Sequence, residues 1–110
     1  MYYLIIQLYK ENYIDDILLA LTTAGIENGT VVDGVNMDNY LNQRVPLFTG
    51  LIPNEGEDTE YCKIISSIID SKKKANDFLK VLEEADIDFE KDNIGRIVLL
   101  PAEILADGME

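Results

Sequence analysis

Apolar residues along this chain fall into four short runs, each typical of a β-strand. The runs cover residues 2–9, 30–35, 61–69 and 97–100, and turn residues or charges flank them. Gly34 lies inside the second run, where a residue without a side chain predicts either a bulge or the close approach of another group to the backbone. The fourth run ends at a proline, which suits the end of a strand.

Two further segments repeat apolar residues at intervals of three and four positions, the spacing that gives a helix one buried stripe. Asn12 and Ser71 stand where N-terminal caps are expected, and Gly25 stands where a left-handed residue would end the first helix. We therefore predict one helix between the first two strands and another between the last two. The predicted stripes are Ile14, Ile17, Leu18 and Leu21 in the first helix and Ala75, Phe78, Leu79 and Leu82 in the second.

The order of elements, strand-helix-strand twice over, predicts one domain over residues 1–110 with an α+β, ferredoxin-like fold. Right-handed crossovers place both helices on one face of a four-stranded antiparallel sheet. In the acidic connection before the last strand, Phe89 is expected to pack under the edge of the core. The tail after Pro101 is expected to form a helical turn.

The first strand is apolar on both sides, because Leu4 and Ile6 point one way and Tyr3 and Ile5 the other. Two helices can cover only one face of the sheet. The second face would then leave a larger apolar patch than monomers usually expose. We expect this face to be buried by further copies of the chain, in a homo-oligomer.

Residues 36–59 show neither a helical nor a strand period, and we predict one long loop there. Loops beyond about 12–15 residues are usually functional or disordered. This loop carries the apolar residues Leu47, Phe48, Leu51 and Ile52. They are expected either to contact a partner protein or to fold back onto the oligomer as a lid.

The charge balance restricts the partners. Asp and Glu number 21 against 9 Lys and Arg, a net charge of −12. This argues against binding to a nucleic-acid backbone or to an anionic membrane, both of which need clustered cations. The second helix begins with Lys72, Lys73 and Lys74, against its dipole. They predict an anion site, a contact with an acidic partner or, more simply, a solvated face.

The residues of catalysis are scarce. Histidine is absent, and Cys62 is the single cysteine, so no internal disulfide can form and a reducing compartment fits. Cys62 lies in a predicted strand without a visible activating base, which favours a structural thiol over a nucleophile. No run approaches the roughly 20 apolar residues of a membrane span. We expect a cytoplasmic, non-catalytic protein.

Several segments, in this order, resemble one known family. They are 21–26 (LTTAGI), 29–32 (GTVV), Lys63-Ile64 at the opening of a strand and 95–101 (GRIVLLP), with the long loop before the third. Together they resemble the PII-like family, the superfamily of the nitrogen regulatory protein PII, over nearly the whole chain. The resemblance implies a trimer that binds adenine nucleotides in clefts between its subunits. It also implies a loop that engages a transporter or an enzyme.

The resemblance also implies which residues bind the ligand. Gly95 and Arg96 match the Gly-Lys that ends the family's phosphate-binding loop, whereas Asn93 and Ile94 replace a Gly-Asp pair and remove one φ-permissive position. Arg96 offers a bidentate fork, and Lys63, Arg44 and Lys91 are expected near it. Together these cations could hold one or two phosphates, which favours AMP or ADP over ATP. Alternatively, Arg96 only pairs with a neighbouring carboxylate. The implied ligand-binding residues are Thr30, Asn36, Met37, Asp38, Lys63, Gly95 and Arg96.

Two alternatives stay open beside this interpretation. One is a divalent-cation-responsive trimer of the cation-tolerance type, which without histidine would have to use oxygen ligands. The other is a structural or interaction trimer that has lost nucleotide binding. The carboxylates available to a cation are Asp33, Asp38, Glu55, Glu57, Asp58 and Glu60.

Overall fold

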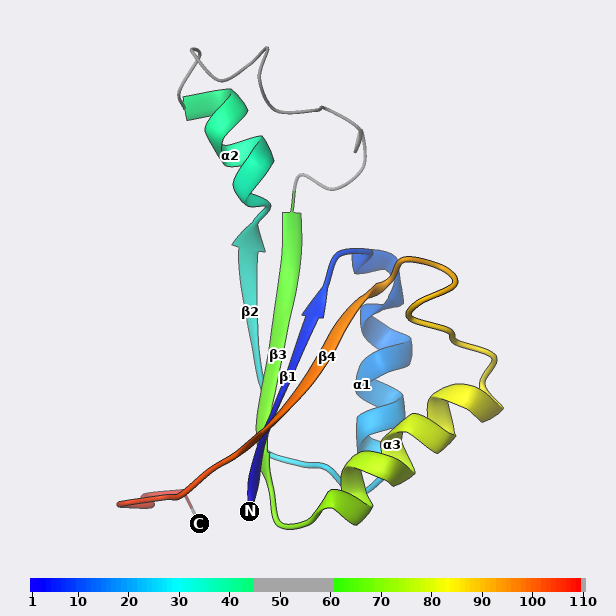
Figure 1. Ribbon diagram of the computed structural model, residues 1–110, viewed down its shortest axis with the longest axis vertical. Helices are drawn as coiled ribbons and strands as arrows, with labels where there is room; N and C mark the ends of the chain where they lie inside the picture. Colours follow the sequence, from blue (N-terminus) through cyan, green and yellow to red (C-terminus); the bar gives the residue numbers. More distant parts are fainter. Residues whose placement is uncertain (45–60, 110) are drawn as a thin grey trace.

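A computed structural model describes residues 1–44 and 61–109 of the chain (Figure 1). Four antiparallel strands form one sheet in the order β2-β3-β1-β4. The helices α1 and α3 lie on the same side of this sheet (Figure 1), which confirms the predicted α+β, ferredoxin-like fold. The bounds are β1 Tyr2–Leu8, α1 Ile14–Thr23, β2 Thr30–Val35, β3 Tyr61–Ile69, α3 Lys72–Glu84 and β4 Gly95–Pro101.

The strand register fixes which side chains share a face of the sheet. Ile6 of β1 lies between Ile65 of β3 and Ile97 of β4, and the next residue, Gln7, lies between Ile64 and Arg96. Successive side chains of a strand point to opposite faces. We call the side beneath the helices, which holds Ile6 and Ile65, the covered face. The side that holds Gln7, Ile64 and Arg96 is the bare face.

The hydrophobic core lies between the covered face and the two helices. Both predicted stripes pack into it, with Ile17 and Phe78 fully buried at 0% exposure. Leu79 is an exception, since 48% of it stays exposed. Phe89 packs against the core from the connection after α3, as predicted. The buried apolar residues are Leu4, Ile6, Leu8, Ile17, Ala20, Leu21, Ile26, Cys62, Ile65, Ile69, Ala75, Phe78, Leu82 and Ile94.

The N-terminal caps differ from the prediction. Asn12 lies inside a short 3-10 helix, Glu11–Tyr13, so Tyr13 precedes α1 and its side chain makes no capping hydrogen bond. Ser71 does occupy the position before α3, but its hydroxyl makes no capping bond either. Both helices therefore depend on their buried stripes rather than on caps at their starts.

The C-terminal ends of both helices close in the same left-handed turn. Gly25 has φ +80°, as predicted, and the N–H of Ile26 donates to the carbonyl of Leu21 at 2.9 Å. This pattern is the Schellman motif. Asp86 takes the equivalent place after α3 with φ +60°. An L side chain pays a steric cost in this conformation, which glycine avoids.

The predicted loop over 36–59 is wrong in its first part, because residues Met37–Arg44 form a helix, α2. Asn36 starts it: its Oδ1 accepts the N–H of Asp38 and its carbonyl accepts the N–H of Tyr40, both at 2.9 Å. Figure 1 shows α2 beyond the end of β2, away from α1 and α3. Residues 45–60 lie outside the described part of the chain.

The last strand is longer than predicted, and the tail after it is not helical. β4 covers Gly95–Pro101, and the N–H of Ala102 still donates to the carbonyl of Met1 at 3.1 Å. The following residues, through Met109, form no helical turn, so this prediction is wrong. Figure 1 shows the tail leaving the sheet at the end opposite α2.

Candidate functional site

The residues predicted to bind a ligand lie at both edges of the sheet. Thr30 begins β2 at one edge, whereas Gly95 and Arg96 begin β4 at the other. Three strand spacings separate these edges, about 14 Å at roughly 4.8 Å each. Within one chain the predicted residues therefore do not converge on a single ligand.

Arg96 lies on the bare face and is exposed. Its cross-strand neighbour in β1 is Gln7. With the part of the chain that the structure describes, its guanidinium forms neither an ion pair nor a hydrogen bond. The alternative of a neighbouring carboxylate partner is therefore not realised among these residues, and the guanidinium fork is available to an anion.

Gly95 has a structural reason to be glycine. A Cβ at this position would stand 2.0 Å from the carbonyl oxygen of Gln7 and 3.1 Å from the Cα of Leu8. No side chain fits between two backbones at that separation. The pair Gly95-Arg96 thus combines a tight contact between β4 and β1 with a free cation.

Lys63 lies on the covered face and is already paired. Its Nζ donates to the carboxylate of Asp33 on β2 and lies 3.9 Å from Oε1 of Glu11. The hydrogen bond to Asp33 raises the pKa of Lys63, so the ammonium stays charged. Since Arg96 points to the opposite face, the structure does not bring these two predicted ligand residues together.

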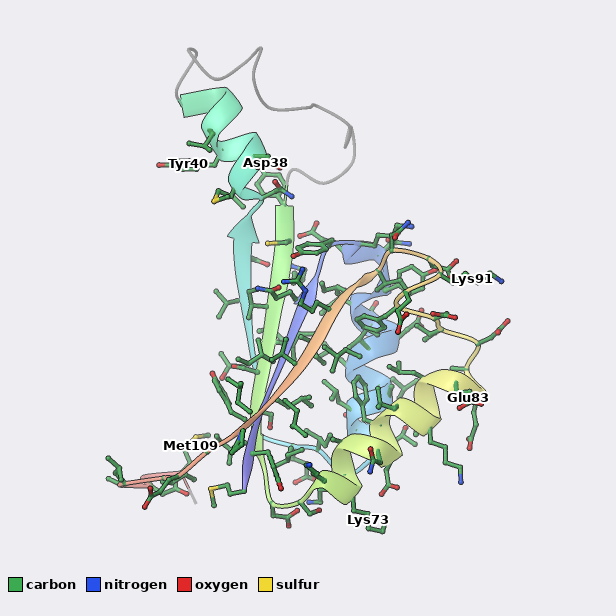
Figure 2. The ribbon with its side chains drawn as sticks, in the orientation of Figure 1. Asp38, Tyr40, Lys73, Glu83, Lys91 and Met109 are labelled. Atoms are coloured by element: carbon green, nitrogen blue, oxygen red, sulfur yellow. The ribbon has the colours of Figure 1, made fainter. Side chains whose placement is uncertain are left out.

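The residues at the start of the predicted loop form the first turn of α2. The side chain of Asn36 is engaged in starting this helix. Met37 is 71% exposed, and Asp38 is also exposed (Figure 2). They lie beyond the C-terminal end of β2. A ligand there would therefore also need residues from another part of the molecule.

The turn before β4 keeps the left-handed residue that the sequence had suggested was lost. Asn93 adopts φ +52°, a conformation that asparagine tolerates better than most residues. The N–H of Ile94 donates to the carbonyl of Phe89 at 3.0 Å, and Ile94 is fully buried. The prediction that the replacement removes a φ-permissive position is therefore wrong.

Cys62 is buried beside a glycine. A Cβ at Gly34 would lie 3.1 Å from the Cys62 sulfur, and the β2–β3 register runs unbroken through both residues. Of the two predictions for Gly34, close approach is confirmed and a bulge is not. Burial, and secondarily the charge of Glu11, raises the pKa of the Cys62 thiol. The thiol is thereby kept in its less nucleophilic, protonated form.

The lysine triplet at the start of α3 is engaged within the chain. The Lys73 ammonium lies 2.9 Å from the Asp77 carboxylate, and that of Lys74 lies 3.7 Å from Asp70. Lys72 stands over the Tyr2 ring, 5.8 Å from its centroid. These contacts favour the solvated face over the anion site.

The bare face is strongly apolar, as the sequence predicts. Among the described residues no helix covers it, since α1 and α3 lie on the other side (Figure 1). Val32 is 51% exposed there and Leu100 45%. The apolar residues of the bare face are Tyr3, Ile5, Val32, Ile64, Ile68, Val98 and Leu100.

Two features of the surface were missed at the level of sequence. One is α2, whose Met37, Tyr40 and Leu41 do carry helical spacing over a short length. The other is a groove of about 630 Å³ between β4 and α3, in which Leu79 lies. In the sequence, only the run of acidic residues after Leu82 indicates this groove.

The alternative cation site receives little support from the described residues. Among them, no three acidic or cysteine side chains stand close enough together to hold a metal ion. Asp33 is already paired with Lys63. Asp38 lies exposed in the first turn of α2. The other residues of this prediction, and those of the predicted partner contact, lie outside the described part: Glu55, Glu57, Asp58, Glu60, Leu47, Phe48, Leu51 and Ile52.

Two comparisons with known proteins were made. Neither the models of known protein families nor the curated proteins give a match to this chain. Within the described ranges, 1–44 and 61–109, no helix is long and apolar enough to cross a membrane.

Proposed function

We propose that this chain is a non-catalytic regulatory protein of PII-like type. Copies of the chain associate through the bare face, most simply as a trimer, and bind a small anionic ligand at the clefts between them. The ligand is an adenine nucleotide, AMP or ADP rather than ATP. The 36–59 segment is presented to a partner protein such as a transporter or an enzyme.

The observation that carries this proposal is the apolar bare face with a free arginine at its border. Apolar patches beyond a few hundred Å² are rare on monomers and mark interaction surfaces. The most exposed members, Val32 at 51% and Leu100 at 45%, come from the two edge strands. The patch therefore spans the width of the sheet. The number of three subunits rests on the resemblance to the PII-like family.

Association in a closed ring also supports a shared ligand site. In a ring, the same two different surfaces of each copy meet at every interface. If the bare face of one copy packs with its β2 border against the β4 border of the next, and the backbone edge of β4 stays unpaired, Thr30 and the 36–38 segment approach the Arg96 of a neighbour. This removes the separation of about 14 Å that keeps these residues apart in one chain.

The size of the ligand follows from the cations that remain free. Arg96 offers one guanidinium fork, which matches one phosphate group in a bidentate pair. Lys63 is held by Asp33 and Glu11 and would have to leave them to contribute. A monophosphate or diphosphate therefore suits the site better than a triphosphate.

A thermal-shift titration with AMP, ADP and ATP tests the ligand. A saturating ligand stabilises the folded protein by about 2.7 kcal/mol at a hundred times its Kd. We expect AMP or ADP to raise the melting temperature and Arg96→Ala to abolish the rise. Lys80→Ala, which removes an exposed cation on α3, should leave it unchanged.

The possible failures of this titration are distinct. No shift with any nucleotide, in a protein that still forms trimers, would contradict the ligand and leave an interaction trimer. A shift that survives Arg96→Ala would place the ligand elsewhere. A shift with Ca²⁺ or Mg²⁺ alone would favour the cation-responsive alternative.

A further inference from the structure

A groove of about 630 Å³ lies between β4 and α3. The buried side chains of Phe78 and Leu82 lie at its floor, and the half-buried Ile97 and Leu99 of β4 form one wall. Leu79 on α3 stands 48% exposed at the groove. The surface is thus apolar inside and open to solvent along its length.

Carboxylates dominate the rim of this groove. Glu83, Asp86, Asp88 and Glu90 follow one another from the end of α3 into the next connection, and Figure 2 shows Glu83 at that end of the helix. None of these four forms an ion pair with another described residue. Among the described residues, Arg96 is the one basic residue that lines the groove, and its side chain belongs to the bare face. The charge at the rim is left without compensation.

The same groove runs beside an open strand edge. The N–H of Tyr9 donates to the carbonyl of Ile94 at 2.9 Å, and that of Ala102 to Met1 at 3.1 Å. In an antiparallel pair every second residue bonds its partner strand, so the residues between point their N–H and C=O groups away. Counting along the register from these two bonds, Ile97 and Leu99 direct theirs to the open edge.

Open edges of this kind bind extended segments as an added strand. A strand added beside Ile97 and Leu99 would direct alternate side chains toward the groove, since neighbouring strands keep their faces in register. Among the described residues, nothing forms a hydrogen bond with this edge of β4. An extended segment at this edge could therefore pair with the main chain of β4, contact the apolar groove and meet the charges of its rim.

We propose that this groove and the edge of β4 bind an extended segment of a partner protein in which apolar residues alternate with lysine or arginine. The apolar side chains fill the groove against Leu79 and Leu99. The basic side chains meet the carboxylates of the rim. This binding site lies on the covered-face side of the sheet, opposite the bare face through which the copies associate.

Charge favours a basic partner segment over two other occupants of the groove, the chain's own tail and a second copy of the chain. The tail 103–109 carries Ile104, Leu105 and Met109, but its charged residues are acidic. A second copy of the chain brings a net charge of −12 to the same rim. Both would add carboxylates to a surface that already has four without a basic partner, whereas a basic segment neutralises them.

Fluorescence polarisation with a defined probe tests the proposal. The probe is a fluorescein-labelled peptide of ten residues in which valine and lysine alternate, and the comparison peptide alternates valine and glutamate. We expect the full-length protein to bind the valine–lysine peptide and not the other. Added salt should weaken the binding, because part of it comes from exposed charges.

Two matched sets of variants separate the groove from the overall charge. The first set, Glu83→Gln with Asp86→Asn and Glu90→Gln, should raise the Kd about tenfold. The control set, Asp16→Asn with Glu27→Gln and Glu103→Gln, makes the same change in net charge at exposed positions outside the groove. It should change the Kd less than about twofold.

A second pair of variants tests the apolar part. Leu79→Ser should weaken binding of the peptide severalfold, whereas Leu19→Ser, at a position 67% exposed on α1, should leave it unchanged. Equal losses in the two charge sets, or in these two variants, would overturn the proposal. So would a wild type that does not bind the peptide, or a sedimented mass that falls with Leu79→Ser, since the latter assigns the groove to a second copy.

Discussion

The two faces of the sheet are formed by the same strands, but the chain covers only one of them with helices. On the covered face, Ile6 and Leu8 are fully buried by elements of the same chain. On the bare face, Val32 and Leu100 are about as apolar but half exposed. Apolar content alone therefore does not distinguish a core from an interface. What distinguishes them is whether the chain supplies a layer to cover the face.

The largest expected effect is in the core between the covered face and α3. Phe78→Ala should lower the free energy of unfolding by about 3–5 kcal/mol, because the side chain is 0% exposed and its removal leaves a cavity. Leu100→Ala on the bare face is the matched change. In dilute protein it should cost under about 1 kcal/mol, and its cost should grow with protein concentration. Urea unfolding at several concentrations measures both, and equal costs at every concentration would remove the distinction between the faces.

The next effect concerns the tight contact of β4 with β1. Gly95→Ala should destabilise the protein by about 1–3 kcal/mol, since the added methyl meets the Gln7 carbonyl oxygen at 2.0 Å. Gly108→Ala, which places its methyl in open space, should be nearly neutral. Thermal unfolding compares the two, and a harmless Gly95→Ala would show that β4 does not lie where its register indicates.

A smaller change is expected at the end of the helix that covers the sheet. Asp86→Gly should stabilise the protein by about 0.5–1 kcal/mol, because glycine takes φ +60° without steric cost. Gly25→Ala, at φ +80° after α1, should change stability in the opposite direction by a similar amount. Chemical denaturation measures both values, and a loss of stability in Asp86→Gly would contradict the left-handed turn.

The smallest effect is that of alkaline pH. Burial raises the pKa of Cys62 above its ordinary value of 9.0, so the unfolded chain releases this proton first and unfolding becomes easier as pH rises past 9. The Asp33 hydrogen bond raises the pKa of Lys63 above 10.5, so its stabilisation is complete below that pH and is lost as pH rises through the folded-state pKa. Unfolding measured from pH 8 to 11 should show Cys62→Ala flattening the first decline and Lys63→Met the second. An unchanged profile in both variants would contradict the burial of Cys62 and the pairing of Lys63 with Asp33 as the causes.

Much of the fold was predictable because its signals are local. The stripe of Ile14, Ile17, Leu18 and Leu21 predicted α1, and the four apolar runs predicted the strands within a few residues. Asn12 shows the limit of this approach. A good capping residue does not cap when the chain inserts a 3-10 turn before the helix.

The arrangement of the candidate site was less predictable, because it depends on pairings between distant segments. Lys63 and Arg96 look equivalent as cations in strands, yet the register points them to opposite faces. Leu79 has the spacing of a core residue, but it lies at the groove beside β4, the edge strand, where no further strand of the described residues completes the layer. A resemblance gives positions along the chain and not the face to which each side chain points.

The central claim, that copies of the chain bury the bare face, is tested most directly by sedimentation over a range of protein concentrations. We predict a species of three times the 12.4 kDa chain mass. Leu100→Glu should convert it to single chains, because each interface would bury an unpaired charge. A wild type that sediments as a single 12.4 kDa chain at every concentration would contradict the account.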